Sequence, residues 1–157
     1  MRIFFAGGGK CTEYIARRLI REEHDLVLVE HDEERCVELS EKLDAQIVQA
    51  DVSSIMDWKR AGLADAEMFM ACTQNDKTNV LACLIANDIA PGALKAIRLR
   101  NPEYEQFKET FARIGLQVDR VIHPKTDIVN RILRVITVPG VSDIRTFADG
   151  RLSLFSM

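Results

Sequence analysis

The sequence has few groups that could bind a metal and no region long enough to cross a membrane. Its four cysteines form no Cys-x-x-Cys pair and are accompanied by only three histidines, which argues against a zinc site. No apolar run approaches the roughly 18 residues that a membrane-spanning helix needs. The first residues show no signal-peptide pattern, so we expect a cytoplasmic protein with reduced cysteines and no direct membrane insertion.

An excess of positive charge is also absent. The formal net charge is −3 and the pI is about 5.7, which gives no electrostatic basis for binding nucleic acid. The chain has 157 residues, of which 47% are hydrophobic and 29% charged, as in ordinary globular proteins. This length allows one domain with a sizeable core and excludes two full domains.

The first 30 residues contain the elements of a nucleotide-binding unit in order. Residues 3–6 are apolar like a buried strand, residues 7–12 form a glycine-rich turn, and residues 13–21 have helical spacing. Residues 26–29 form a second apolar strand that ends at the acid Glu30. This order is typical of a mononucleotide-binding half of a Rossmann fold, although a glycine turn alone can be purely structural.

Each part of this unit has a physical role. Glycines let the backbone approach a pyrophosphate closely, and the start of the helix presents unpaired N–H groups and a positive dipole end. Glu30 follows Gly9 by 21 positions, near the spacing expected of an acid that accepts hydrogen bonds from ribose hydroxyls. Such an acid also repels a 2′-phosphate.

Two residues of the turn depart from the usual fingerprint or invite a second interpretation. Thr12 stands where a third glycine or an alanine is expected, so it should either separate the helix slightly from the strand or bind the ligand through its hydroxyl. Cys11 lies at the helix start, where a thiol pKa can fall. It is either a small residue beside a phosphate site or a redox-active group.

Further strands and helices alternate through the chain. Strands are expected at residues 45–50, 68–72, 93–100 and 118–122, with helices between them, and Gly115 ends the last of these helices. The sequence predicts a doubly wound, mainly parallel six-stranded α/β sheet of order 3-2-1-4-5-6, with helices on both faces. A nucleotide-binding domain would span residues 1–124, a crossover helix residues 125–140, and a hairpin in the first part of a truncated second domain residues 141–157.

Polar residues follow several of these strands. Asp51, after the third strand, is either a ligand-binding acid or, with Ser53, a cap for the next helix. The polar loop at residues 73–79 follows the fourth strand, at the switch point of the sheet. It leads into an apolar helix at residues 80–86, one side of which is a candidate contact with a second subunit. Arg98 is either an edge charge in a salt bridge or an arginine that binds phosphate.

The motifs in these segments resemble those of the RCK or KTN domains, the TrkA N-terminal nucleotide-binding domains of potassium uptake and channel regulators. The resemblance covers residues 1–124 and is carried by residues 3–12, 29–35, 49–52, T-Q-N-D-K-T-N at 73–79, R-L-R-N-P-E-Y at 98–104 and D-R-V-I-H-P at 119–124. Residues 139–143 and 147–151 resemble the opening of the C-terminal domain of the same regulators.

The resemblance implies a ligand sensor that binds NAD(H) or an adenine nucleotide (ATP, ADP or AMP) and is not an enzyme. The implied cofactor-binding residues are Gly7, Gly8, Gly9, Lys10, Cys11, Thr12, Glu30, His31, Asp51, Val52, Thr73, Gln74, Asn75, Asn79 and Arg98. It further implies a homodimer or a higher, ring-like oligomer that gates a membrane-embedded potassium transporter or channel, with the domain on the inner face of the cell membrane.

Two other functions stay open from the sequence. The first is an NAD-dependent oxidoreductase, which would need a proton donor or acceptor near the nicotinamide. The histidines His24, His31 and His123 are poorly placed for that role, because the first two flank the second strand and the third lies in a turn. The second is a dimerisation scaffold with a degenerate nucleotide site.

Overall fold

The computed structural model describes residues 1–52, 54–101, 103–104, 108–124, 143–147 and 152–156. The chain divides into two compact units, residues 1–122 and residues 123–157, and each is described by itself.

The first unit contains a six-stranded sheet in which every neighbouring pair is parallel. The strand order is β3-β2-β1-β4-β5-β6, so the expected doubly wound Rossmann-like fold is confirmed. The strands are β1 (Arg2–Ala6), β2 (Asp25–Glu30), β3 (Gln46–Gln49), β4 (Met68–Ala71), β5 (Leu94–Arg98) and β6 (Arg120–Ile122).

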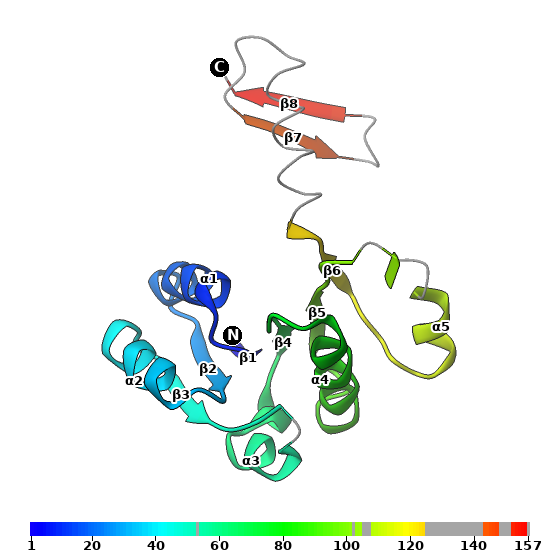
Figure 1. Ribbon diagram of the computed structural model, residues 1–157. Coiled ribbons are helices and arrows are strands. Elements are labelled where there is room, and N and C mark those ends of the chain that lie inside the picture. Colours follow the sequence, from blue (N-terminus) through cyan, green and yellow to red (C-terminus); the bar gives the residue numbers. More distant parts are fainter. Residues whose placement is uncertain (53, 102, 105–107, 125–142, 148–151, 157) are drawn as a thin grey trace. The chain divides into compact units, whose positions relative to one another are not determined.

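Helices cover both faces of this sheet (Figure 1). Helices α1 (Lys10–Arg21) and α2 (Glu33–Lys42) pack on one face, and α3 (Ile55–Arg60), α4 (Asp76–Ile89) and α5 (Lys108–Arg113) pack on the other. A short 3-10 helix, η1, spans Leu63–Asp65. Because β1, β2 and β4 are covered on both sides, they are buried along nearly their whole length, as expected for a parallel sheet, whereas the edge strands β3 and β6 are partly exposed.

Strand β1 shows how the sequence pattern builds the two layers. Its side chains alternate, so that Ile3 and Phe5 join the core beneath α1 and α2, while Phe4 and Ala6 join the core beneath α3 and α4. All four are at most 2% exposed. The strand is therefore fixed from both faces, and the glycine turn that follows Ala6 starts from a rigid position.

An aromatic cluster fills the layer beneath α3 and α4. The Trp58 ring lies 5.7 Å from the Phe4 ring and 5.5 Å from the Phe69 ring between centroids, and all three side chains are fully buried. Rings at this spacing pack favourably beyond the area they bury. The cluster ties α3 to the two central strands, from which the site residues extend.

Several expected boundaries differ by a few residues. The fifth strand is shorter than expected: Leu99 N–H still donates to Ile122 of β6, but the N–H groups of Arg100 and Asn101 donate to the Asp76 side chain instead. The last helix ends as expected, since Gly115 has a φ of 77° and Leu116 N–H donates to the Phe111 carbonyl at 2.8 Å.

The second unit contains an antiparallel hairpin, β7 (Asp143–Phe147) and β8 (Leu152–Ser156), at the position expected from sequence. The expected crossover helix at residues 125–140 lies outside the described residues. Among the residues that are described, no helix combines the length and apolarity needed to cross a bilayer.

We expect Phe69→Ala to lower the free energy of unfolding by about 3–5 kcal/mol, because it removes the ring that contacts both Phe4 and Trp58 and leaves a cavity. Urea unfolding followed by tryptophan fluorescence measures the change. Tyr14→Ala is the control: this side chain is 77% exposed, so its loss should change stability by less than about 0.5 kcal/mol. Equal losses in the two variants would contradict a core built on the aromatic cluster.

Candidate functional site: a cavity at the glycine loop

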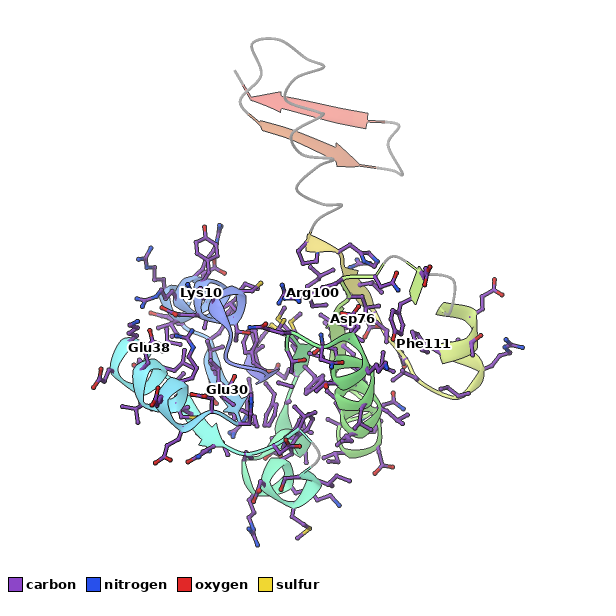
Figure 2. All side chains as sticks on the ribbon, in the orientation of Figure 1. Lys10, Glu30, Glu38, Asp76, Arg100 and Phe111 are labelled. Atoms are coloured by element: carbon purple, nitrogen blue, oxygen red, sulfur yellow. The ribbon has the colours of Figure 1, made fainter. Side chains whose placement is uncertain are left out.

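A cavity of about 790 Å³ opens at the carboxyl ends of the central strands. Strand β1 pairs with both β2 and β4. The chain continues from β1 to α1 on one face of the sheet and from β4 to α4 on the other, so a crevice forms between the two connections. The cavity is lined by Gly7, Gly9, Lys10, Val29, Glu30, His31, Asp32, Arg35, Glu38, Ala50, Asp51, Val52, Cys72, Thr73, Gln74, Asn75, Thr78 and Leu81. Figure 2 labels three of these residues, Lys10 on α1, Glu30 at the end of β2 and Glu38 on α2.

Two glycines of the loop are required by the fold itself. Gly7 has a φ of 100°, and a Cβ there would lie 2.9 Å from the backbone of Thr73. A Cβ on Gly8 would lie 2.6 Å from Leu39 and 3.1 Å from the Glu30 side chain. Gly7 therefore excludes larger residues whether or not a ligand is bound, while a larger residue at Gly8 would require the Leu39 and Glu30 side chains to shift.

Gly9 is different. It has an ordinary extended conformation, with φ −63° and ψ 173°, which any L-residue adopts. No atom in the described part of the chain lies within 4 Å of a Cβ built there. Packing of the described residues therefore gives no reason for a glycine, but close approach of a ligand to the backbone does.

All three carbonyl groups of the loop are bound. Thr12 Oγ1 donates to the Gly7 carbonyl at 2.6 Å, Arg35 Nε donates to the Gly8 carbonyl at 2.8 Å, and Glu13 N–H donates to the Gly9 carbonyl at 3.0 Å. Because α1 begins at Lys10, the first N–H groups of this helix have no acceptor within the helix. The loop thus offers N–H groups, with their partial positive charge, to the cavity it lines.

The hydroxyl of Thr12 is consequently used inside the protein. Its side chain is fully buried beneath the loop. Thr12, which stands where a third glycine is expected, stabilises the loop because its hydroxyl donates to the Gly7 carbonyl.

Glu30 joins the glycine loop to the turn that follows β2. One carboxylate oxygen, Oε2, accepts the Gly8 N–H at 2.7 Å, and the other, Oε1, accepts the N–H groups of His31 at 2.8 Å and Asp32 at 3.1 Å. Burial raises the pKa of this carboxyl, but the three N–H groups outweigh burial and the net pKa is lowered. Glu30 is therefore a fixed anion at the edge of the cavity.

His31 is the exposed neighbour of this anion. Its Nδ1 lies 2.6 Å from Glu30 Oε1, while 78% of its side chain is exposed. The ring thus extends from the cavity rim toward solvent.

A network of charged side chains connects α1 to α2 beside the loop. The Arg35 guanidinium donates to Glu13 at 2.7 Å and to Glu38, and Arg17 donates to the other oxygen of Glu13 at 2.7 Å. The hydrogen bond from Arg17, followed by that from Arg35, lowers the pKa of Glu13 to about 2. This network holds the Arg35 side chain, of which 17% is exposed, against the loop.

The opposite wall of the cavity is held by Asn79, which is fully buried. Its Oδ1 accepts the N–H and the hydroxyl of Thr73 at 2.8 and 2.7 Å, and its Nδ2 donates to the Arg98 carbonyl at 2.7 Å. Asn75 caps α4 by accepting the N–H groups of Lys77 and Thr78. Asn79 thus positions Thr73 from behind.

Asp76 links this wall to the chain that follows β5. Its carboxylate accepts the N–H groups of Arg100 at 3.0 Å and of Asn101 at 2.9 Å (Figure 2). The T-x-N-D-x-x-N and R-x-R-N-P motifs, widely separated in the sequence, are therefore joined by side chain to backbone bonds.

Arg98 lies at the end of β5 next to the cavity wall formed by Cys72. Its Nε is buried and has no hydrogen-bond partner among the described residues. Burial, together with the neighbouring Cys11, raises the pKa of the Cys72 thiol to about 12, while Arg98 opposes that rise. Cys11 itself is half-buried, and all four cysteines are free thiols.

Asp51 and Val52 line the cavity after β3, on the same side as Glu30. The N-cap position of α3 is occupied by Ser54, whose hydroxyl bonds to Asp57, and the Ser54 N–H donates to the Asp51 carbonyl at 2.9 Å. The interpretation of Asp51 as a cap, made together with Ser53, stays a prediction. Ser53 lies outside the described residues.

The structure brings most of the expected binding residues together at one cavity. Among them the lining contains Gly7, Gly9, Lys10, Glu30, His31, Asp51, Val52, Thr73, Gln74 and Asn75. Gly8, Cys11, Thr12, Asn79 and Arg98 lie in or behind its walls. Sequence reasoning missed eight residues of the lining. Four of them, Arg35 and Glu38 on α2 and Thr78 and Leu81 on α4, come from helices, and the other four, Val29, Asp32, Ala50 and Cys72, lie at or after strand ends. Within the described ranges, acidic, histidine and cysteine side chains form no group of three that could hold a metal ion.

Comparison with known proteins identifies the family. Residues 3–124 match the family described as the TrkA-N domain, and this match covers more than half of the chain. The chain belongs to the TrkA-N domain family. The resemblance of its motifs to that family is therefore confirmed.

Named relatives of this TrkA-N chain are potassium uptake proteins. It is 32% identical over 158 residues to the Trk system potassium uptake protein TrkA of Vibrio alginolyticus, which covers 100% of this chain and 34% of the relative. It is 29% identical over 157 residues to the TrkA homolog of Methanothermobacter thermautotrophicus, which covers 100% of this chain and 70% of the relative. The chain thus spans about a third of the length of the bacterial relative.

Solved structures share the fold. The structure titled "GsuK channel bound to NAD" superposes with a TM-score of 0.71 at 18% identity, covering 94% of this chain and 25% of that one. The TrkA-N domain of the inner membrane protein ybaL from Escherichia coli gives a TM-score of 0.74 at 16% identity, and the match covers 86% of this chain and 96% of the ybaL chain. At these identities the likeness establishes the fold of the TrkA-N chain.

We expect Glu13→Gln to destabilise the TrkA-N domain by about 1 kcal/mol at pH 7. The ionised carboxylate stabilises the folded state above its ordinary pKa of 4.5, and that stabilisation is lost as the pH falls through its folded pKa of about 2. The stability difference between wild type and Glu13→Gln, measured by urea unfolding, should therefore shrink between pH 4.5 and pH 2.

Glu22→Gln provides the matched control, because Glu22, the residue directly after α1, pairs with Arg18 of that helix at 3.4 Å on the exposed surface. It should change stability by less than about 0.5 kcal/mol at either pH. A loss in Glu13→Gln that is independent of pH would contradict the role assigned to the ionised carboxylate.

Proposed function

We propose that this TrkA-N domain binds NAD(H) or an adenine nucleotide and acts as the regulatory, non-catalytic part of a potassium uptake or channel system. The observation that carries the proposal is the glycine loop, whose carbonyl groups are all bound elsewhere while Gly9 leaves open space at the start of α1. Such a loop is suited to a phosphate group. The GsuK structures whose titles name NAD and ADP share the fold and support the choice of ligand.

The cavity suggests how such a ligand would lie. The pyrophosphate would contact Gly9 and the first turn of α1, and the adenosine ribose would lie at Glu30. Both Glu30 oxygens already accept N–H groups, but within the described residues Oε2 accepts only the Gly8 N–H and can accept one more hydrogen bond, as from a ribose hydroxyl. Asp51 and Val52 would face the adenine.

The opposite wall would serve the remainder of a dinucleotide. Thr73, Gln74 and Asn75 line this side of the cavity, and Arg98, whose Nε has no hydrogen-bond partner in the described part of the chain, lies behind it. A volume of about 790 Å³ falls within the range of roughly 300–1,000 Å³ that is usual for small-molecule sites.

The side chains at the cavity suit binding better than catalysis. His31 lies beside Glu30 on the adenosine side, and His24 contacts the amino terminus at 3.5 Å, at the end of β1 away from the cavity. Neither is placed to exchange a proton at the far wall, where a nicotinamide would lie.

The relatives support the proposed regulatory role. Trk uptake proteins and the GsuK channel point to a membrane-embedded potassium transporter or channel as partner, with this domain in the cytoplasm. Ligand binding would shift an equilibrium between two conformations and so gate the partner. Leu81 and Leu84 on α4 are 45% and 43% exposed, which supports this helix as a contact in a homodimer or ring.

The test is calorimetric titration of the purified chain with NADH, NAD, ATP and ADP in turn. We expect saturable one-site binding of at least one of them, with no turnover of the dinucleotide. A chain that is folded by circular dichroism yet binds none of the four at millimolar concentration would refute the proposal.

We expect Gly9→Ala to weaken ADP binding about tenfold or more, because its methyl group occupies the space needed for phosphate to approach the backbone. Stability should change by less than about 1 kcal/mol, since the backbone at Gly9 accepts alanine without a clash. Isothermal titration and thermal unfolding give the two numbers.

Gly92→Ala is the matched control for Gly9→Ala. Gly92 also has open space around its missing Cβ, but it lies between α4 and β5, away from the cavity lining. Its replacement should leave ADP affinity unchanged. Substitutions at these glycines test ligand affinity with little effect on the fold. Substitution of Glu30 would test it less cleanly, because it would also leave three backbone N–H groups without their acceptor.

A further inference from the structure

We propose that Arg35 is a positioning residue for phosphate: it fixes the Gly8–Gly9 peptide so that the Gly9 N–H faces the anion. The inference rests on the proposed function and assigns a role to a residue outside the glycine loop.

The orientation follows from one hydrogen bond. Arg35 Nε donates to the Gly8 carbonyl at 2.8 Å, and the peptide between Gly8 and Gly9 is trans. In a trans peptide the C=O and the following N–H point to opposite sides. The Gly9 N–H is therefore turned away from Arg35, and Gly9 lines the cavity.

This peptide needs an external anchor more than its neighbours do. The Gly7 and Gly9 carbonyls are bound locally, by Thr12 and Glu13, as the chain enters α1. The Gly8 carbonyl is bound by a side chain 27 residues further along, on α2. Gly8 and Gly9 lack side chains that would restrict rotation, so a free Gly8 carbonyl could turn toward the cavity and repel phosphate.

Arg35 is itself held in place. Its guanidinium donates to Glu13 on α1 at 2.7 Å and to Glu38 on α2, and only 17% of the side chain is exposed. Two carboxylates thus surround its single positive charge. Arg35 therefore acts here as an oriented donor to the loop, with the phosphate contact left to the backbone N–H groups.

The test compares Arg35→Met with Arg17→Met in titrations with ADP and with adenosine. Arg17 also pairs with Glu13, at 2.7 Å, so each variant loses one positive charge and one partner of Glu13, but only Arg35 contacts the loop. We expect Arg35→Met to lose about tenfold in ADP affinity and less than about twofold in adenosine affinity. Arg17→Met should bind both ligands like wild type.

Arg35→Lys is the second variant and decides the question if Arg35→Met does not fold. Lysine keeps the charge and the apolar stem but has a single ammonium in place of the separate Nε donor. We expect it to lose at least about threefold in ADP affinity, again without loss for adenosine.

The outcomes separate this inference from the proposed function. Wild-type ADP affinity in the folded Arg35 variants, or an equal loss for ADP and adenosine, would overturn the positioning role while nucleotide binding stands. Failure of the wild-type chain to bind ADP, NAD, NADH or ATP would overturn both.

Discussion

The carboxylate of Glu30 is the interaction on which the cavity depends. It accepts N–H groups from the glycine loop and from the turn after β2, and so it fixes two chain segments against each other at the edge of the sheet. A buried anion is costly unless hydrogen bonds replace its hydration, and three backbone donors meet that requirement here. The same residue that would contact a ribose therefore also holds the loop that would contact a phosphate.

The fold could be predicted from the sequence because local patterns determine it. Short apolar strands alternate with segments of helical periodicity, and this pattern predicts a parallel sheet covered by helices on both faces. The glycine turn after the first strand indicates where the crevice opens. Gly7 and Gly8 could likewise be identified, since a tight turn between a strand and a helix calls for residues without side chains.

The partners of polar side chains could not be predicted in the same way. Thr12 and Asn79 are both among the implied binding residues, and the sequence also allowed Thr12 a packing role. The structure shows that both side chains are buried and bind the backbone of neighbouring segments. A hydroxyl or an amide can bind either a ligand or the protein backbone, and the sequence does not distinguish the two. Only the fold shows which partners lie within reach. Arg35 shows the reverse case, because a surface arginine at the start of a helix gives no sign that it reaches a loop 27 residues earlier.

The doubly wound topology has a mechanical consequence. The two halves of the sheet, β3-β2-β1 and β4-β5-β6, meet along a single seam between β1 and β4, and the cavity walls come from both halves. A ligand that contacts both walls would reduce the twisting of the two halves relative to each other. The binding free energy would then include a loss of conformational entropy that requires no change in the average structure.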